Sequence, residues 1–115
     1  MSASTLRAEH CRPLKGPEHR LDDAALGELL ALLPGWSLRE DGRAIGRNFR
    51  FDGFLPALSF ASAIGWMAEQ ENHHPDLELG WGYVRVRYAT HDVGGLSRND
   101  FICAAKVDAL ADAAG

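Results

Sequence analysis

The sequence has few cysteines and no excess of basic residues, and each shortage excludes a class of protein. Cys11 and Cys103 are the only cysteines among 115 residues, which is too few for the disulfide framework of a small secreted domain. Twelve basic residues stand against sixteen acidic ones, so the net charge at pH 7 is −4 and the pI is near 5.7. Because nucleic-acid binding requires a basic surface, we expect no nucleic-acid partner.

Long apolar runs are also missing. No stretch reaches the roughly 20 apolar residues that span a bilayer, and the first 17 residues lack the apolar region of a secretion signal. We therefore expect no membrane partner and a cytoplasmic location. The remaining composition, 46% hydrophobic and 24% charged, is that of an ordinary globular domain.

A chain of this length fits one domain. Residues 1–19 lack apolar periodicity, and we predict a flexible N-terminal arm there, followed by a folded domain over residues 20–115. Cys11 falls in the arm. Cys103 falls in a helical pattern, where we expect it to be a small core residue.

Three segments have the apolar period of a helix. The first is marked by leucines at positions 26, 29, 30 and 33, with Asp22 or Asp23 as its N-cap. The second runs from about Phe54 to Glu71, with Asp52 as a plausible cap, and its apolar face is wide enough to serve both the core and a partner subunit. The third follows Ser97 and continues to the C-terminus, with a carboxylate three residues after its cap.

Segments of period two separate these helices and predict strands. Residues 36–40 and 45–51 flank Asp41-Gly42, which suits a two-residue hairpin turn. Arg47 interrupts the apolar side of the second strand, which indicates an edge or a bulge. Residues 77–81 and 83–90 form a second hairpin, and the latter strand is expected to leave an unpaired edge for another subunit.

The element order is therefore α-β-β-α-β-β-α. This order predicts an α+β fold, with a four-stranded antiparallel sheet and three helices packed on one face. We find no internal repeat and no low-complexity segment.

Three of the five histidines lie in a window of 32 residues that begins at Glu69 and ends at Asp100. His73-His74-Pro75 follows the second predicted helix, and Thr90-His91 ends the last predicted strand. Because an imidazole can give and take a proton near neutral pH, this group suits acid–base chemistry on a small molecule. We expect the imidazoles at the helix exit and at the strand end to meet in one small cleft.

The spacing Glu-x3-His-His-Pro-x5-aromatic-x9-His-x8-Asp resembles the signature of the pterin-4a-carbinolamine dehydratase family. Every gap has the family length, and the signature residues are Glu69, His73, His74, Pro75, Trp81, His91 and Asp100. The resemblance covers roughly residues 20–112, and the predicted element order agrees with the family. Two departures are Leu77, where the family usually has an aromatic, and an arm longer than minimal members need.

The resemblance implies a 4a-hydroxytetrahydrobiopterin dehydratase, which takes water from 4a-hydroxytetrahydropterin, gives the quinonoid dihydropterin and so recycles tetrahydrobiopterin. A general acid must protonate the C4a hydroxyl, and a general base must remove the proton of N5. The implied catalytic residues are His73, His74 and His91; His73 and His91 are preferred for proton transfer, and which is the acid stays open. Pterin contacts are expected from Glu69, Asn72, Pro75, Thr90, Asp92 and Asp100.

The resemblance implies no metal or other cofactor. It also implies a homodimer or homotetramer and a functional link to an aromatic amino acid hydroxylase.

Two alternatives remain. Adjacent histidines with a third histidine and carboxylates could bind zinc, although the spacing matches no His-Glu-x-x-His or Cys–His pattern. The same fold also serves as a non-catalytic binding module, either a transcriptional coactivator or an assembly chaperone. The complete histidine set favours catalysis.

Overall fold

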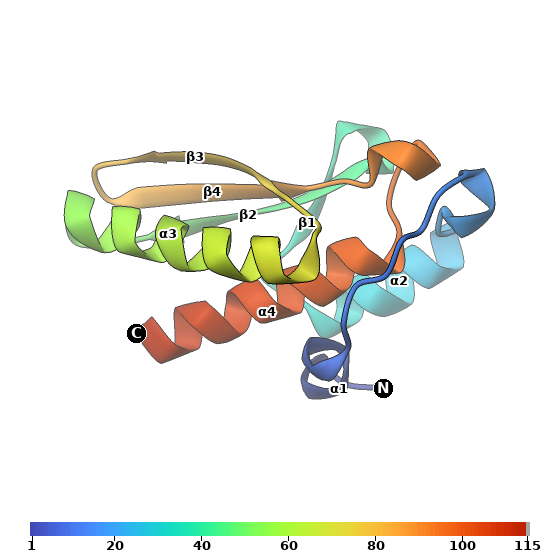
Figure 1. The fold of residues 1–115 in the computed structure, drawn as a ribbon, viewed down its shortest axis with the longest axis horizontal. Helices are drawn as coiled ribbons and strands as arrows, with labels where there is room; N and C mark the ends of the chain where they lie inside the picture. The colour runs from blue at the N-terminus through green and yellow to red at the C-terminus, as the bar shows by residue number, and fades with distance from the viewer. Residues whose placement is uncertain (115) are drawn as a thin grey trace.

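The structure is a computed structural model that describes residues 1–114. A four-stranded antiparallel sheet lies against a layer of helices, which cover one of its faces (Figure 1). The elements are α1 (Ala3–Ala8), α2 (Asp23–Leu32), β1 (Ser37–Arg39), β2 (Ala44–Arg50), α3 (Phe54–Glu71), β3 (Asp76–Gly80), β4 (Tyr83–Tyr88) and α4 (Arg98–Ala114). The predicted α+β class and the order from α2 to α4 are confirmed. Within the described residues, no helix combines the length and apolar character that crossing a bilayer requires.

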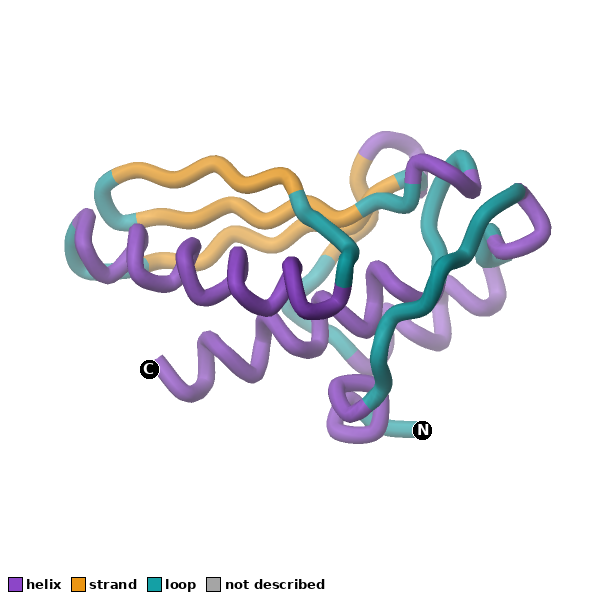
Figure 2. Tube along the Cα trace, viewed as in Figure 1, coloured by secondary structure: helices purple, strands orange, loops and turns teal. Residues whose placement is uncertain are grey.

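The strand order is β1-β2-β4-β3, so β4 lies inside the sheet (Figure 2). Val86 of β4 pairs with Arg47 on one side and with Leu77 on the other. The prediction that residues 83–90 form an unpaired edge is therefore wrong, and the outer strands are β1 and β3. The alternation of apolar residues reports which sheet face is covered, and it carries no information on whether a strand has one neighbour or two.

The covered face of the sheet forms the core. Val84, Val86 and Tyr88 alternate along β4 and are buried, as their parity predicts. They belong to the same apolar cluster as Ile64 of α3 and Phe101 of α4. The helices thus pack on the sheet through the faces that the apolar periodicity predicts.

Arg47 is accommodated beside this core by a partner from α4. Its Nη1 donates to Oδ1 of Asp108 at 2.8 Å, and its guanidinium lies 4.5 Å from the centroid of the Phe49 ring. The indole of Trp36 donates to the same oxygen at 2.9 Å. β1 pairs with β2 only over residues 44–46, so one side of Arg47 is left open by the sheet even though β2 is an inner strand.

The turn between β1 and β2 differs from the predicted two-residue turn. Glu40–Gly42 form a 3-10 turn in which Glu40 and Asp41 have positive φ of 53° and 57°. The carboxylate of Glu40 accepts a hydrogen bond from Nη2 of Arg87 at 2.8 Å. This contact fastens the turn to β4, and an ion pair between distant residues is not visible in the turn sequence.

Both ends of α3 are set by residues with positive φ. Gly53, with φ of 137°, is the N-cap in place of the predicted Asp52, and no side chain caps this end. Asn72 ends the helix in the left-handed region, with φ of 52°, where asparagine is tolerated better than most residues. Asn72 therefore determines the direction in which the following histidines leave the helix.

The first 19 residues carry more structure than the predicted flexible arm. Leu6 of α1 is fully buried and belongs to the core cluster, and α1 packs against α4. Further along, the amide of Gly16 donates to the carbonyl of Asp92 at 3.2 Å. One buried leucine produces no periodicity, so the sequence pattern could not show this packing. The domain boundary after residue 19 stays a prediction.

We expect Leu6→Ala to lower the free energy of unfolding by about 2–5 kcal/mol, the usual range for a buried leucine. Urea unfolding followed by circular dichroism measures this change. Leu38→Ala is the matched control, because Leu38 is 42% exposed and lies in β1. If both variants unfold at the wild-type urea concentration, α1 does not contribute to the core.

Candidate functional site

The exit of α3 and the start of α4 bring an imidazole and a carboxylate into contact. After Asn72 turns the chain, Pro75 prevents the helix from continuing. His73 Nε2 lies 2.6 Å from Oδ1 of Asp100. The side chain of His73 is 13% exposed and that of Asp100 is 0% exposed, so this is a buried acid–base pair.

Asp100 is held by two further hydrogen bonds. Its Oδ2 accepts from the hydroxyl of Thr90 at 2.7 Å and from the backbone amide of Ser97 at 3.0 Å. A buried carboxylate is costly unless such donors satisfy it. The bond to Ser97 also caps the N-terminus of α4, as predicted, so one side chain joins the end of β4, the start of α4 and the exit of α3.

The surroundings of His73 favour its protonated form. Burial lowers the pKa of His73, but the hydrogen bond and charge of Asp100, with a smaller contribution from Cys103, outweigh burial and raise the pKa above its ordinary value. The ring of Tyr88 stacks on the imidazole at 5.5 Å between centroids and 12° between planes. The imidazole is thus fixed in orientation and carries a proton to higher pH than a free histidine does.

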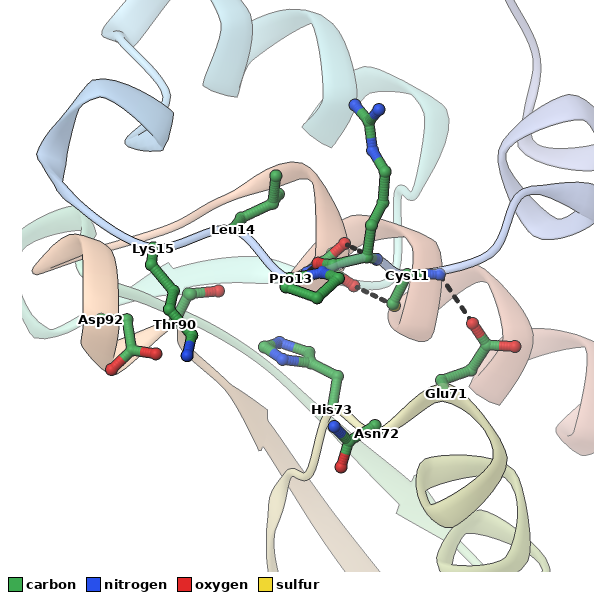
Figure 3. A pocket seen from close by; sticks show the side chains of 11 residues that line it. Cys11, Pro13, Leu14, Lys15, Glu71, Asn72, His73, Thr90 and Asp92 are labelled. Carbon is green, nitrogen blue, oxygen red and sulfur yellow. Dashed lines mark hydrogen bonds between the residues drawn. The ribbon is translucent and has the colours of Figure 1, made fainter.

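His73 lines a cavity of about 290 Å³ (Figure 3). This volume is at the lower end of the range for small-molecule sites. The α3 exit contributes Asn72 and His73, and Thr90 and Asp92 follow β4. The opposite wall is a segment of the N-terminal region that passes above the imidazole in this view and consists of Cys11, Arg12, Pro13, Leu14 and Lys15.

The lining determines what the cavity can hold. Amide, hydroxyl, carboxylate, ammonium and imidazole groups surround it, from Asn72, Thr90, Asp92, Lys15 and His73. Such a mixture of donors and acceptors suits a polar heterocycle. Across residues 1–114, no three His, Cys, Asp or Glu side chains are grouped so that they could hold a metal ion.

His74 lies on a different surface from His73. Its Nε2 is 3.0 Å from Oε1 of Glu69, and the two side chains are 53% and 77% exposed. Together they line a shallow depression beside Trp66. Successive residues of an extended segment point in opposite directions, and the residue before a proline is driven to an extended conformation, so the adjacent histidines separate.

His91 is also exposed and does not line the cavity of His73. It begins the 3-10 turn His91–Val93 and lines a neighbouring depression with Arg87 and Gly95, which shares Thr90 with the cavity. His73, His74 and His91 thus line three depressions, and those of His73 and His91 share Thr90. The expectation that the imidazoles serve one cleft stays a prediction.

Of the predicted site residues, the structure brings His73, Thr90 and Asp100 into one hydrogen-bonded group and adds Asn72 and Asp92 to the cavity. The predicted residues that do not line this cavity are Glu69, His74, Pro75, His91 and Asp100, and Asp100 has no exposed surface with which to contact a ligand. Their proposed roles stay predictions. The signature aromatic Trp81 is 70% exposed at the turn between β3 and β4.

Sequence reasoning missed the N-terminal wall and its anchors. The carboxylate of Glu71 accepts from the amide of Cys11 at 2.7 Å and lies 2.8 Å from Nδ1 of His10. Asn99 accepts from the amide of Arg12 at 3.3 Å and donates to its carbonyl at 2.7 Å. Each anchor is a polar residue near a helix end, which is a common surface pattern, so no local signal distinguishes it.

Comparisons with known proteins agree on one family. The family model described as "Pterin 4 alpha carbinolamine dehydratase" matches residues 19–110. A protein of Xanthomonas campestris pv. campestris (strain 8004) named "Putative pterin-4-alpha-carbinolamine dehydratase" is 55% identical over 107 residues, which are 93% of this chain and 91% of that protein. A protein of the same name from Xanthomonas oryzae pv. oryzae (strain PXO99A) is 53% identical with the same coverage.

Two solved structures share the fold. A transcriptional coactivator/pterin dehydratase from Brucella melitensis has a TM-score of 0.76 and 34% identity, covering 80% of this chain and 98% of that chain. A pterin dehydratase-like RuBisCO assembly factor of the alpha-carboxysome has a TM-score of 0.58 and 24% identity, covering 67% of this chain and 89% of that chain. The second likeness concerns the fold alone.

Asp100→Asn should lower the pKa of His73, because the charge that opposes the effect of burial is removed. Titration of the His73 ring protons by NMR measures this change. Glu69→Gln is the control, since it removes the partner of the exposed His74 and leaves Asp100 intact. An unchanged His73 titration in Asp100→Asn would contradict the assignment.

The raised pKa of His73 also predicts how stability depends on pH. A group whose pKa rises on folding adds stability below its unfolded pKa, and this stability is lost as the pH rises through the folded pKa. The difference in unfolding free energy between wild type and His73→Gln should therefore be largest below about pH 6.5, the ordinary histidine pKa, and should fall as the pH rises above it. A series of urea titrations at increasing pH measures it, and a difference that grows with pH would refute the coupling.

Proposed function

The chain belongs to the pterin 4 alpha carbinolamine dehydratase family, and we propose that it removes water from 4a-hydroxytetrahydropterin to give the quinonoid dihydropterin. The observation that carries this proposal is the buried His73–Asp100 pair, whose imidazole lines a cavity suited to a small heterocycle. The reaction would return the oxidised pterin of an aromatic amino acid hydroxylase to the recycling route.

The chemistry needs two proton transfers. The hydroxyl on C4a leaves far more readily as water than as hydroxide, so a general acid protonates it. The lone pair of N5 forms the new double bond as the C–O bond breaks, and a general base takes the N5 proton. Each well-placed proton-transfer group contributes about 10²–10⁴-fold in rate.

His73 suits the role of general acid. Its raised pKa keeps a share of the imidazole protonated near neutral pH, and Asp100 stabilises that cation and fixes the ring. Once the proton is donated, the neutral imidazole can take the proton of N5 in the same cavity. His74 with Glu69, or His91, would supply the base if the pterin also reaches their depressions.

The cavity offers groups for recognising the pterin. Asn72 presents an amide that can donate to and accept from the amide-like edge of the ring, and Asp92 presents an acceptor for its amino group. Thr90 belongs to both this cavity and the depression of His91. Glu69 and Pro75, which we also expected to contact the pterin, would act by holding the helix exit.

His73→Gln should slow dehydration by about 10²-fold or more, because glutamine can donate to Asp100 but cannot exchange a proton. The assay follows the ultraviolet absorbance of 4a-hydroxypterin generated by a hydroxylase. The control is His19→Gln, since His19 lies 3.8 Å from Glu18 and outside the cavity. Parallel His74→Gln and His91→Gln variants locate the base.

Wild-type rates from His73→Gln would remove His73 from the mechanism. No activity of the wild-type protein on any 4a-hydroxypterin would favour the second candidate, a binding module. One observation supports that candidate: α3 leaves Leu55 and Trp66 68% and 76% exposed. The same surface suits self-association, and it replaces the β4 edge as the proposed contact of a homo-oligomer.

If α3 holds the subunits together, Trp66→Glu should shift the protein toward monomer, because a buried unpaired charge opposes association. Size-exclusion chromatography with light scattering measures the mass. Trp81→Glu provides the comparison, since Trp81 is 70% exposed but lies at the β3–β4 turn. Equal masses for wild type and Trp66→Glu would place any subunit contact elsewhere.

A further inference from the structure

The two cysteines, 92 positions apart in the sequence, are neighbours in the structure. The Sγ atoms of Cys11 and Cys103 lie 3.4 Å apart. Cys103 is fully buried in α4, and Cys11 is half-buried in the segment that follows α1. A disulfide bond of about 2.05 Å would require the sulfurs to approach by little more than 1 Å.

The backbone around Cys11 is already held where such a bond would need it. The amide of Cys11 donates to Glu71 at 2.7 Å, and both backbone groups of Arg12 are hydrogen-bonded to Asn99. Glu71 ends α3 and Asn99 begins α4, so both anchors belong to rigid elements. Because the two thiols are held close together, joining them orders little additional chain.

The segment that carries Cys11 is also the wall of the His73 cavity. Residues 11–15 line it, and the amide of Gly16 ties their far end to the carbonyl of Asp92. A compound bound beside His73 would therefore lie against this segment (Figure 3). The bonding state of Cys11 therefore affects whether the wall can move.

We propose that Cys11 and Cys103 form a reversible disulfide, made by a peroxide and broken by a small thiol, which fastens residues 11–15 across the cavity. One cysteine, as thiolate, attacks an oxygen of hydrogen peroxide and becomes a sulfenic acid, while the other oxygen leaves as hydroxide and takes a proton to form water. The second sulfur then attacks the sulfenic sulfur and displaces hydroxide, which takes the second thiol proton. Two thiols lose two electrons, and one peroxide becomes two waters.

The electrostatics favour a thiolate at Cys103. The hydrogen bond from Cys11 lowers the pKa of the Cys103 thiol, and although burial opposes this, the nearby His73 adds to the lowering. Thiolates are the reactive form of cysteine. Transient disulfides of this kind occur in compartments that are otherwise reducing.

The chemical test uses the full-length protein. Reduced protein is treated with hydrogen peroxide, the remaining thiols are alkylated, and the digest is analysed by mass spectrometry. Trypsin should release residues 8–15 linked to residues 99–106, because proline after Arg12 blocks cleavage there. Dithiothreitol should separate the two peptides, and Cys11→Ser and Cys103→Ala should each abolish the link.

The structural test compares hydrogen exchange in the reduced protein and in the peroxide-treated protein. The amides of Cys11 and Arg12 bond to buried side chains, so their exchange reports opening of residues 11–15. We expect oxidation to slow this exchange about tenfold. Oxidation should not change the exchange of this segment in the Cys11→Ser variant. Two fully alkylated thiols after oxidation, a link only between molecules, or unaltered exchange in the linked protein would each overturn the proposal.

The effect on turnover rests on the proposed function and is tested separately. Oxidation should lower the dehydration rate of wild type at least tenfold, with recovery on addition of thiol, and should not change the rate of Cys11→Ser. If the link and the slowed exchange appear while no pterin is turned over, the disulfide stands and the dehydratase assignment fails. If dehydration is unaffected by a complete link, the segment does not control access.

Discussion

The buried carboxylate of Asp100 is the interaction on which the site depends. It is bonded to the imidazole of His73, the hydroxyl of Thr90 and the amide of Ser97. These partners come from the exit of α3, the loop after β4 and the start of α4, and without Asp100 the buried amide of Ser97 would lose this acceptor. The same contacts that hold the α3 exit against the start of α4 therefore also set the protonation of the imidazole.

This arrangement separates two histidines that are adjacent in the chain. His73 faces inward to a carboxylate with no exposed surface, and His74 faces outward to the exposed Glu69. Two backbone features produce both environments: the left-handed conformation of Asn72 and the proline that follows His74. The result is a buried pair that can be tuned by the protein interior and an exposed pair that is screened by solvent.

Local patterns predicted most of the fold and part of the site. The apolar period gave α3 with its observed ends, and the parity of Val84, Val86 and Tyr88 gave the buried face of β4. The signature contains His73 and Asp100, and the family resemblance added Thr90; the structure joins these three by hydrogen bonds. The strand order could not be predicted from these patterns, since Val86 would be buried whether β4 were an inner strand or an outer one.

The same limitation explains the N-terminal region. Leu6, Cys11 and the anchors Glu71 and Asn99 have no periodicity among themselves, and only the folded chain brings them together. The family model matches residues 19–110, whereas one wall of the cavity lies at residues 11–15. A fragment trimmed to the matched region would keep every histidine of the signature and lose that wall. Two proteins with identical signatures can thus have differently shaped cavities, and the shape of the cavity can vary in a stretch that no signature records.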